Sequence, residues 1–275
     1  MFDAHLEAAS LTPTDIDNLL AFGVRGALCP PDTRSPVETV DQLVGRLSLH
    51  LCTVIPRLRA QGFDARAVLG IAPELEPQTS SDEALAWIDA RCGEGLVRAI
   101  GVLGIDDGTP WRLRLLTRQL ELAARHRLPA LVRWPHEADR HQVDALHAAI
   151  DGSGLPADRL WFTGVTEPQL LPLARAGYGC VLHAGPFGLT ADSCARLLRL
   201  APRAALRRIA VGTGNARGSR QPFALPAVVV ALHHLGHPDG SRPWRALHDS
   251  ALDRATATGV APTAAPIAPR TASGC

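Results

Sequence analysis

The sequence contains no lysine, and all 28 of its basic residues are arginine. This absence excludes Schiff-base chemistry, a lysine general base and a metal pair bridged by a carboxylated lysine. Neither positive nor negative charge is in excess, because the chain has 28 basic and 27 acidic residues. The chain therefore lacks the general positive charge that attracts nucleic acid or an anionic membrane, and we expect neither as a partner.

Long apolar runs and paired cysteines are also missing. The longest apolar stretch, Phe223–Leu232, is too short to span a bilayer, and the first residues lack the basic and apolar regions of a signal peptide. The six cysteines are scattered without a CxxC pair, which argues against a zinc finger. With 46% hydrophobic and 20% charged residues, the composition is that of a globular protein, and we expect a cytoplasmic one.

Short β-forming runs alternate with helical patterns along most of the chain, which is typical of parallel βα units. We expect strands at Phe2–His5, Gly26–Cys29, Ala65–Ile71, Val97–Val102, Ala130–Arg133, Leu160–Thr163, Gly179–His183 and Arg208–Gly212. Eight such units predict an α/β fold of the closed (β/α)₈ TIM-barrel type, whose usual size is roughly 250 residues. An open doubly wound sheet is the alternative.

The alternating pattern ends after Gly236. Residues 251–275 consist largely of Ala, Thr, Pro and Gly and contain few large apolar side chains. Such a segment cannot offset the entropy that is lost on ordering. We therefore expect one barrel domain at residues 1–236 and a disordered tail at residues 237–275.

In a TIM barrel the functional side chains follow the carboxyl ends of the strands. By this rule His5 is the candidate metal ligand, and the candidate catalytic residues are Glu7, Asp106, Asp107, Arg133, His136 and His183. The glycine-rich loop after the last strand could bind an anionic ligand through its backbone N–H groups or could be a flexible loop without function. Its candidate ligand-binding residues are Gly212, Thr213, Gly214, Asn215 and Arg217.

Structural explanations compete with these functional ones. Asp106 and Asp107 precede a Gly-Thr-Pro sequence and could simply cap the next helix. His136 and His183 could be ordinary polar residues of loops. An ion pair between Glu7 and Arg133 could be structural.

Four segments carry a family pattern, and they are Asp3–Glu7, Ile100–Asp107, Gln119–Ala123 and Leu128–Arg133. In this order they resemble the landmarks of the TatD-like hydrolases, which are metal-dependent barrel enzymes of the amidohydrolase superfamily. Two further segments, Arg133–His136 and Pro222–Pro226, resemble most the EboB branch of that family. The resemblance implies a barrel that hydrolyses phosphoester or amide bonds with a divalent metal ion (Zn, Mn or Mg).

Most of the family's metal ligands are replaced in this chain. In the His-x-His pattern of the family His5 is kept, and the second histidine becomes Glu7. The other ligand positions of the family fall on Val102, on Arg133, near Gly164 and near residues 214–216. A divalent ion needs about four N or O ligands, and a guanidinium among them would repel it. The replacements predict no metal cofactor, or at most one divalent ion.

The resemblance and the replaced ligands together favour a catalytically degenerate barrel, a pseudoenzyme that binds a small anionic molecule. In this interpretation Arg133 forms an ion pair with Glu7 or Asp3 in place of the metal. The EboB branch implies a role in a secondary-metabolite precursor pathway, with the products of neighbouring genes as partners. The alternative is an active hydrolase whose remodelled mononuclear site uses His5 with Glu7 or Asp106.

Overall fold

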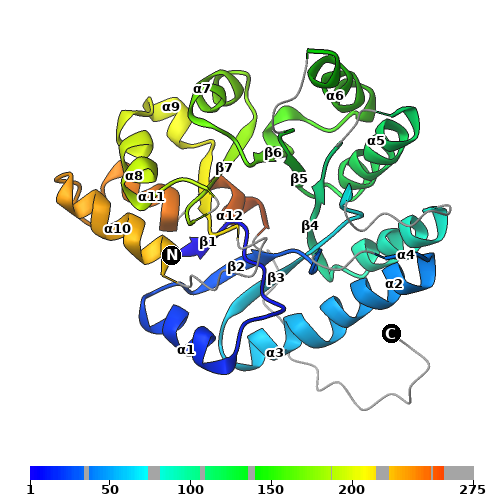
Figure 1. The fold of residues 1–275 in the computed structure, drawn as a ribbon, viewed down its shortest axis with the longest axis horizontal. Helices are drawn as coiled ribbons and strands as arrows, with labels where there is room; N and C mark the ends of the chain where they lie inside the picture. The colour runs from blue at the N-terminus through cyan, green and yellow to red at the C-terminus, as the bar shows by residue number, and fades with distance from the viewer. Residues whose placement is uncertain are drawn as a thin grey trace.

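The computed structural model describes residues 1–33, 37–73, 81–105, 109–135, 140–186, 188–214, 223–248 and 250–256. Its eight parallel strands follow one another around a single sheet in sequence order, and helices lie outside them (Figure 1). The predicted (β/α)₈ barrel is therefore confirmed. A doubly wound sheet is excluded because the strand order never reverses.

The strands are β1 (Phe2–Asp3), β2 (Gly26–Cys29), β3 (Asp64–Leu69), β4 (Val97–Leu103), β5 (Ala130–Arg133), β6 (Leu160–Thr163), β7 (Gly179–His183) and β8 (Ile209–Gly212). Strands β2, β5, β6 and β7 have the bounds expected from the sequence, and the others differ from them by at most two residues at either end. Such strands can be predicted from the sequence because a strand that is buried on both faces appears there as a continuous apolar segment.

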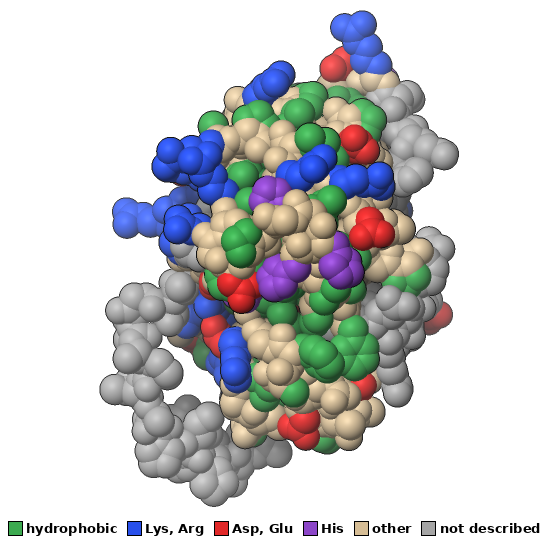
Figure 2. Space-filling view, turned by 90° about the vertical axis from the view of Figure 1, so that its left-hand side faces the viewer, with side chains coloured by type: hydrophobic (Ala, Val, Ile, Leu, Met, Phe, Trp, Pro, Cys, Tyr) green, Lys and Arg blue, Asp and Glu red, His purple; other side chains and the backbone are tan. Residues whose placement is uncertain are grey.

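The α-helices are α1 (Pro13–Ala21), α2 (Val40–Leu49), α3 (Ile55–Ala60), α4 (Asp82–Gly93), α5 (Pro110–Arg125), α6 (Arg140–Ser153), α7 (Glu167–Arg175), α8 (Ala191–Leu200), α9 (Arg203–Leu206), α10 (Ala224–His234), α11 (Arg242–His248) and α12 (Ala251–Thr256). A π-helix at His50–Val54 joins α2 to α3, and a 3₁₀ turn at Ala157–Arg159 precedes β6. Helices α8, α10 and α11 cover one side of the barrel (Figure 1), and several arginine side chains lie on the surface of this side, both at its left edge and near its centre (Figure 2). No helix in the described ranges is long and apolar enough to cross a membrane.

The buried side chains form two separate clusters. The larger one lies between the sheet and the surrounding helices. The smaller one fills the inside of the barrel and takes members from every strand, namely Phe2, Ala4, Leu28, Val68, Ala99, Leu131, Trp161, Val181 and Ala210, with Leu252 of α12 as the remaining member. Since side chains alternate between the two faces of a strand, this cluster identifies which positions point inward.

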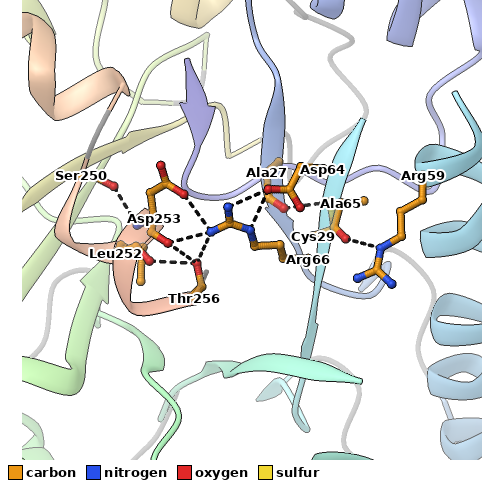
Figure 3. A network of polar contacts seen from close by, with 10 residues as sticks. All are labelled: Ala27, Cys29, Arg59, Asp64, Ala65, Arg66, Ser250, Leu252, Asp253 and Thr256. Atoms are coloured by element: carbon orange, nitrogen blue, oxygen red, sulfur yellow. Dashed lines mark hydrogen bonds and ion pairs between the residues drawn. The ribbon is translucent and has the colours of Figure 1, made fainter. Parts of the chain in front are cut away.

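The last helix, α12, closes the amino-terminal end of the barrel. Leu252 is fully buried among the interior side chains, and Arg66 of β3 joins the helix to the sheet (Figure 3). The Nη1 atom of Arg66 donates to the Asp253 carbonyl oxygen at 2.7 Å and to Thr256 Oγ1 at 2.8 Å, and it lies 2.8 Å from the Asp253 carboxylate. The Arg66 guanidinium also lies 4.4 Å from the centre of the Phe2 ring.

These contacts correct the expected start of the disordered tail. Residues 242–248 and 251–256 are helical and pack on the barrel, whereas a disordered tail was expected from residue 237. The composition did not predict this order, because one buried leucine and the contacts of one half-buried arginine order a segment that is otherwise rich in Ala and Thr. Residues 257–275 lie outside the described part of the chain.

Candidate functional site

Three polar side chains point into the barrel at the carboxyl ends of neighbouring strands. Arg133, Thr163 and His183 each lie two residues after an interior residue of β5, β6 or β7. Alternation along a strand gives them the same inward direction. The strand register pairs Arg133 with Thr163, so the two side chains are neighbours at the barrel mouth.

A pair of histidines lies at the same end of the barrel. His5 follows β1, and its ring meets the ring of His183 edge to face, with the ring centres 4.9 Å apart. Gly214 lies against this pair: a Cβ atom at that position would be 2.7 Å from the His183 ring, and its φ of 51° is unfavourable for other residues. The Gly214 N–H also donates to the His5 carbonyl oxygen at 3.0 Å. The loop after β8 therefore fixes the position of both rings.

Asp3 joins the first strand to the last and so closes the barrel. Its Oδ1 atom accepts from the N–H groups of His5 at 2.9 Å and Thr213 at 3.1 Å, and its Oδ2 atom accepts from the Thr213 hydroxyl at 2.8 Å. The Ala4 N–H donates to the Val211 carbonyl oxygen at 2.9 Å in the same region. Asp3 and Thr213 are fully or almost fully buried, and they hold His5 in place.

Burial sets the protonation state of the site. It lowers the pKa of His183 to about 4, and the positive charge of Arg133 adds to this effect. Burial, His183 and Arg133 together lower the pKa of His5 well below its usual value. Burial raises the pKa of Asp3 to about 7, against the hydrogen bonds from His5 and Thr213 that favour its carboxylate. At neutral pH the two imidazoles are therefore uncharged, and Arg133 supplies the positive charge that acts on them.

Three buried polar atoms at this end of the barrel have no hydrogen-bond partner among the residues that the structure describes. They are His5 Nδ1, Thr163 Oγ1 and His183 Nε2. Buried polar groups almost always have a partner, and one left without a partner costs about 1–3 kcal/mol. Their concentration around Arg133 is typical of a place where a polar molecule binds.

The structure brings together part of the residue set predicted from the sequence. His5, Arg133, His183 and the loop residues Gly212, Thr213 and Gly214 meet at the barrel mouth. The side chain of Glu7 is buried, and its ion pair with Arg133 stays a prediction. The predicted residues that lie outside the described part of the chain are Asp106, Asp107, His136, Asn215 and Arg217.

Two residues of the site were missing from the predicted set. Asp3 was considered only as a partner for Arg133, yet both of its oxygens accept hydrogen bonds from His5 or Thr213. Thr163 is the last residue of β6, and only this position at a strand end could have marked it as a residue of the site. The hydroxyl of Thr163 matters because it is buried and has no partner in the described ranges, and the fold alone reveals this.

The described donors do not fit the divalent ion that the family resemblance implies. No three His, Cys, Asp or Glu side chains come together in a way that could hold a metal ion within the described ranges. Zinc sites in proteins use at least three such ligands. Two imidazoles that face each other near a guanidinium make a poor cation site, because a second positive charge there would be repelled.

Solved structures with the same barrel include proteins of hydrolase type. A TatD-like protein from Archaeoglobus fulgidus superposes with a TM-score of 0.66 at 19% identity, over 83% of this chain and 92% of that one. The chain shares its barrel fold with that protein. A phosphotriesterase homology protein from Escherichia coli, solved with phosphate in its active site, gives a TM-score of 0.64 at 12% identity over 90% of this chain and 94% of that one.

A lactonase from Listeria monocytogenes gives a TM-score of 0.61 at 12% identity, over 90% of this chain and 91% of that one. No protein-family model matches the chain, and no curated protein sequence is detectably similar to it. At these identities the neighbours establish the barrel fold and leave the activity to be argued from the site.

Proposed function

We propose that this chain is a catalytically degenerate TatD-like barrel that binds a small anionic molecule at its mouth. The observation that carries the proposal is the group of buried, unpartnered atoms of His5, Thr163 and His183 around the charge of Arg133. In the TatD-like pattern His5, Arg133 and a position near Gly164 would be metal ligands. Here they offer hydrogen-bond donors and one fixed positive charge.

The chemistry of these groups suits a carboxylate or a phosphate. A guanidinium presents its N–H groups in a planar fork that matches two oxygen atoms of either anion. A neutral imidazole can donate one N–H to an oxygen, and the Thr163 hydroxyl can donate another. The low pKa of His183, about 4, keeps that ring neutral, so that Arg133 is the main attraction for an anion.

The proposed ion pair between Glu7 and Arg133 is compatible with this role. A guanidinium has five N–H donors, so it can contact a neighbouring carboxylate and a ligand at once. Asp3 is the weaker candidate for the pair because both of its oxygens already accept hydrogen bonds. In this proposal Glu7 orients Arg133 toward the ligand and takes no part in metal binding.

A remodelled hydrolase is the second candidate. Two unpartnered imidazole nitrogens, His5 Nδ1 and His183 Nε2, favour it, because unprotonated imidazole nitrogen is a common metal ligand. Such a site would need further ligands from outside the described residues, of which Asp106 is the one that the sequence suggests. We rank it second because the charge of Arg133 acts on both imidazoles.

The proposal extends to the role of the protein in the cell. The EboB-like segments support a part in handling a secondary-metabolite precursor, in the cytoplasm, with proteins encoded by neighbouring genes as partners. A binding protein would suit this role because a hydrolase scaffold that holds its ligand without cleaving it can deliver the ligand to a partner.

Metal analysis and titration calorimetry test the two candidates together. Elemental analysis follows loading with Zn²⁺, Mn²⁺ and Mg²⁺, and calorimetry uses citrate and inorganic phosphate as probes. We expect less than one metal ion per chain and an anion affinity that Arg133→Met lowers at least tenfold. Arg114→Met, which removes an exposed arginine of α5, is the matched control and should leave the affinity unchanged. One bound metal ion per chain that is lost in His5→Ala would contradict the proposal and support the hydrolase.

A further inference from the structure

A cavity lies at the opposite end of the barrel from the histidine pair. It has a volume of about 180 Å³ and lies between the segment that leads into β8 and the helices α11 and α12. Five of its eight lining residues are arginines, and they are Arg203, Arg207, Arg242, Arg245 and Arg254. No acidic residue lines this cavity in the described part of the chain.

Four of these arginines have no ion-pair or hydrogen-bond partner for their side chains among the described residues, and they are Arg203, Arg207, Arg242 and Arg245. Other arginines of the chain differ in this respect. Arg91 pairs with Glu94 at 2.8 Å, and Arg125 pairs with Asp89 at 2.7 Å. Positive charges that converge on one cavity repel each other, and a bound anion would relieve this repulsion.

Ser250 adds a hydroxyl group to the lining of the same cavity. The residue is 5% exposed, and its Oγ atom accepts a hydrogen bond from the Asp253 N–H at 3.0 Å. The Ser250 hydroxyl hydrogen has no acceptor among the described residues, so it can rotate to donate to a ligand in the cavity that Ser250 lines. The cavity thus combines positive charge with a buried hydroxyl donor.

We propose that this cavity binds a small molecule that carries a diphosphate or triphosphate group. A guanidinium group can donate two parallel hydrogen bonds to two oxygens of a phosphate. The positive charge of several guanidinium groups around one cavity is larger than the negative charge of a single carboxylate, so a ligand with more than one phosphate neutralises it better. A cavity of about 180 Å³ has room for a chain of two or three phosphates.

The position of the cavity gives the bound phosphate a structural consequence. Arg203 and Arg207 belong to the segment before β8, whereas Arg242 and Arg245 belong to α11 and Arg254 to α12. A polyphosphate between them connects the carboxyl-terminal helices to the barrel. Binding therefore stabilises the helix that closes the amino-terminal end, because a ligand that binds only the folded state raises its stability.

Titration calorimetry with inorganic pyrophosphate at constant ionic strength tests this proposal on the full chain. We expect one molecule per chain to bind at least tenfold more tightly than orthophosphate does. The double variant Arg207→Gln/Arg245→Gln should weaken pyrophosphate binding at least tenfold. These two side chains are exposed, so the variant should fold, and circular dichroism checks this.

The control variant Arg114→Gln/Arg140→Gln removes the same charge from exposed positions on α5 and α6 and should change the affinity less than twofold. Equal weakening by both double variants, or equal binding of sulfate and pyrophosphate, would overturn the proposal. Loss of pyrophosphate binding in Arg133→Met alone would also overturn it and assign the anion to the mouth of the barrel. ATP and AMP as further probes distinguish a nucleotide from free pyrophosphate, and tighter binding of ATP than of AMP is the expected order.

Discussion

Replacing Arg66 by methionine removes the charged contact that joins α12 to the barrel and keeps an unbranched side chain against Phe2. The variant loses the hydrogen bonds to the Asp253 carbonyl oxygen at 2.7 Å and to Thr256 Oγ1 at 2.8 Å, together with the ion pair to the Asp253 carboxylate. Hydrogen bonds of charged groups contribute about 1.5–3 kcal/mol each, and partial exposure of Asp253 reduces the share of the ion pair. We expect the free energy of unfolding to fall by about 3 kcal/mol.

Urea unfolding followed by circular dichroism measures this loss, and hydrogen exchange of the α12 amides shows where it occurs. Arg91→Met is the matched control, since Arg91 also pairs with an acid and lies 5.2 Å from an aromatic ring, that of Trp87, but sits at the surface. The control should lose less than about 1 kcal/mol. If Arg66→Met costs no more than the control and α12 exchanges at the wild-type rate, the proposed attachment of the helix is refuted.

Three further changes test other parts of the fold. His50 is buried, and its pKa of about 4 in the folded protein lies below the value of 6.5 in the unfolded chain. Between pH 4 and pH 6.5 the unfolded state therefore binds more protons than the folded state. As a result, the free energy of unfolding falls as the pH drops through this range. Between pH 7.5 and pH 5.0 the wild type should lose on the order of 2 kcal/mol more than His50→Phe, as measured by urea unfolding at both pH values. Gly214→Ala places a Cβ atom 2.7 Å from the His183 ring and should cost about 2 kcal/mol. In an NMR spectrum it should also remove the contact between the rings of His5 and His183, and an unchanged contact would contradict the geometry. Leu252→Ala leaves a cavity inside the barrel and should lower the free energy of unfolding by about 2–5 kcal/mol, whereas a loss under 1 kcal/mol would mean that α12 does not fill the barrel end.

Much of the candidate site could be located from strand ends alone. Arg133 and His183 each end a strand that was predicted with the correct bounds, and the carboxyl ends of barrel strands are where function gathers. His5 was found in the same way. What the strand ends could not show is that the rings of His5 and His183 touch, because that contact depends on how the barrel closes.

The protonation states of the site also depended on the fold. A histidine has an ordinary pKa near 6.5 wherever it stands in a sequence, and only burial beside Arg133 lowers that of His183 to about 4. Asp3 likewise looked like a possible partner for Arg133, and the structure shows that it binds Thr213 and the His5 backbone. These differences arise from contacts between residues far apart in the chain.

The sequence by itself determined the eight strands, their order and the end of the barrel at which polar residues gather, because continuous apolar runs and helical periodicity are local properties of the chain. Tertiary structure alone decided which polar atoms lack partners, how α12 closes the barrel and where five arginines surround one cavity. Such features depend on distances in space and on exclusion of water, and these follow only when segments far apart in the chain pack together.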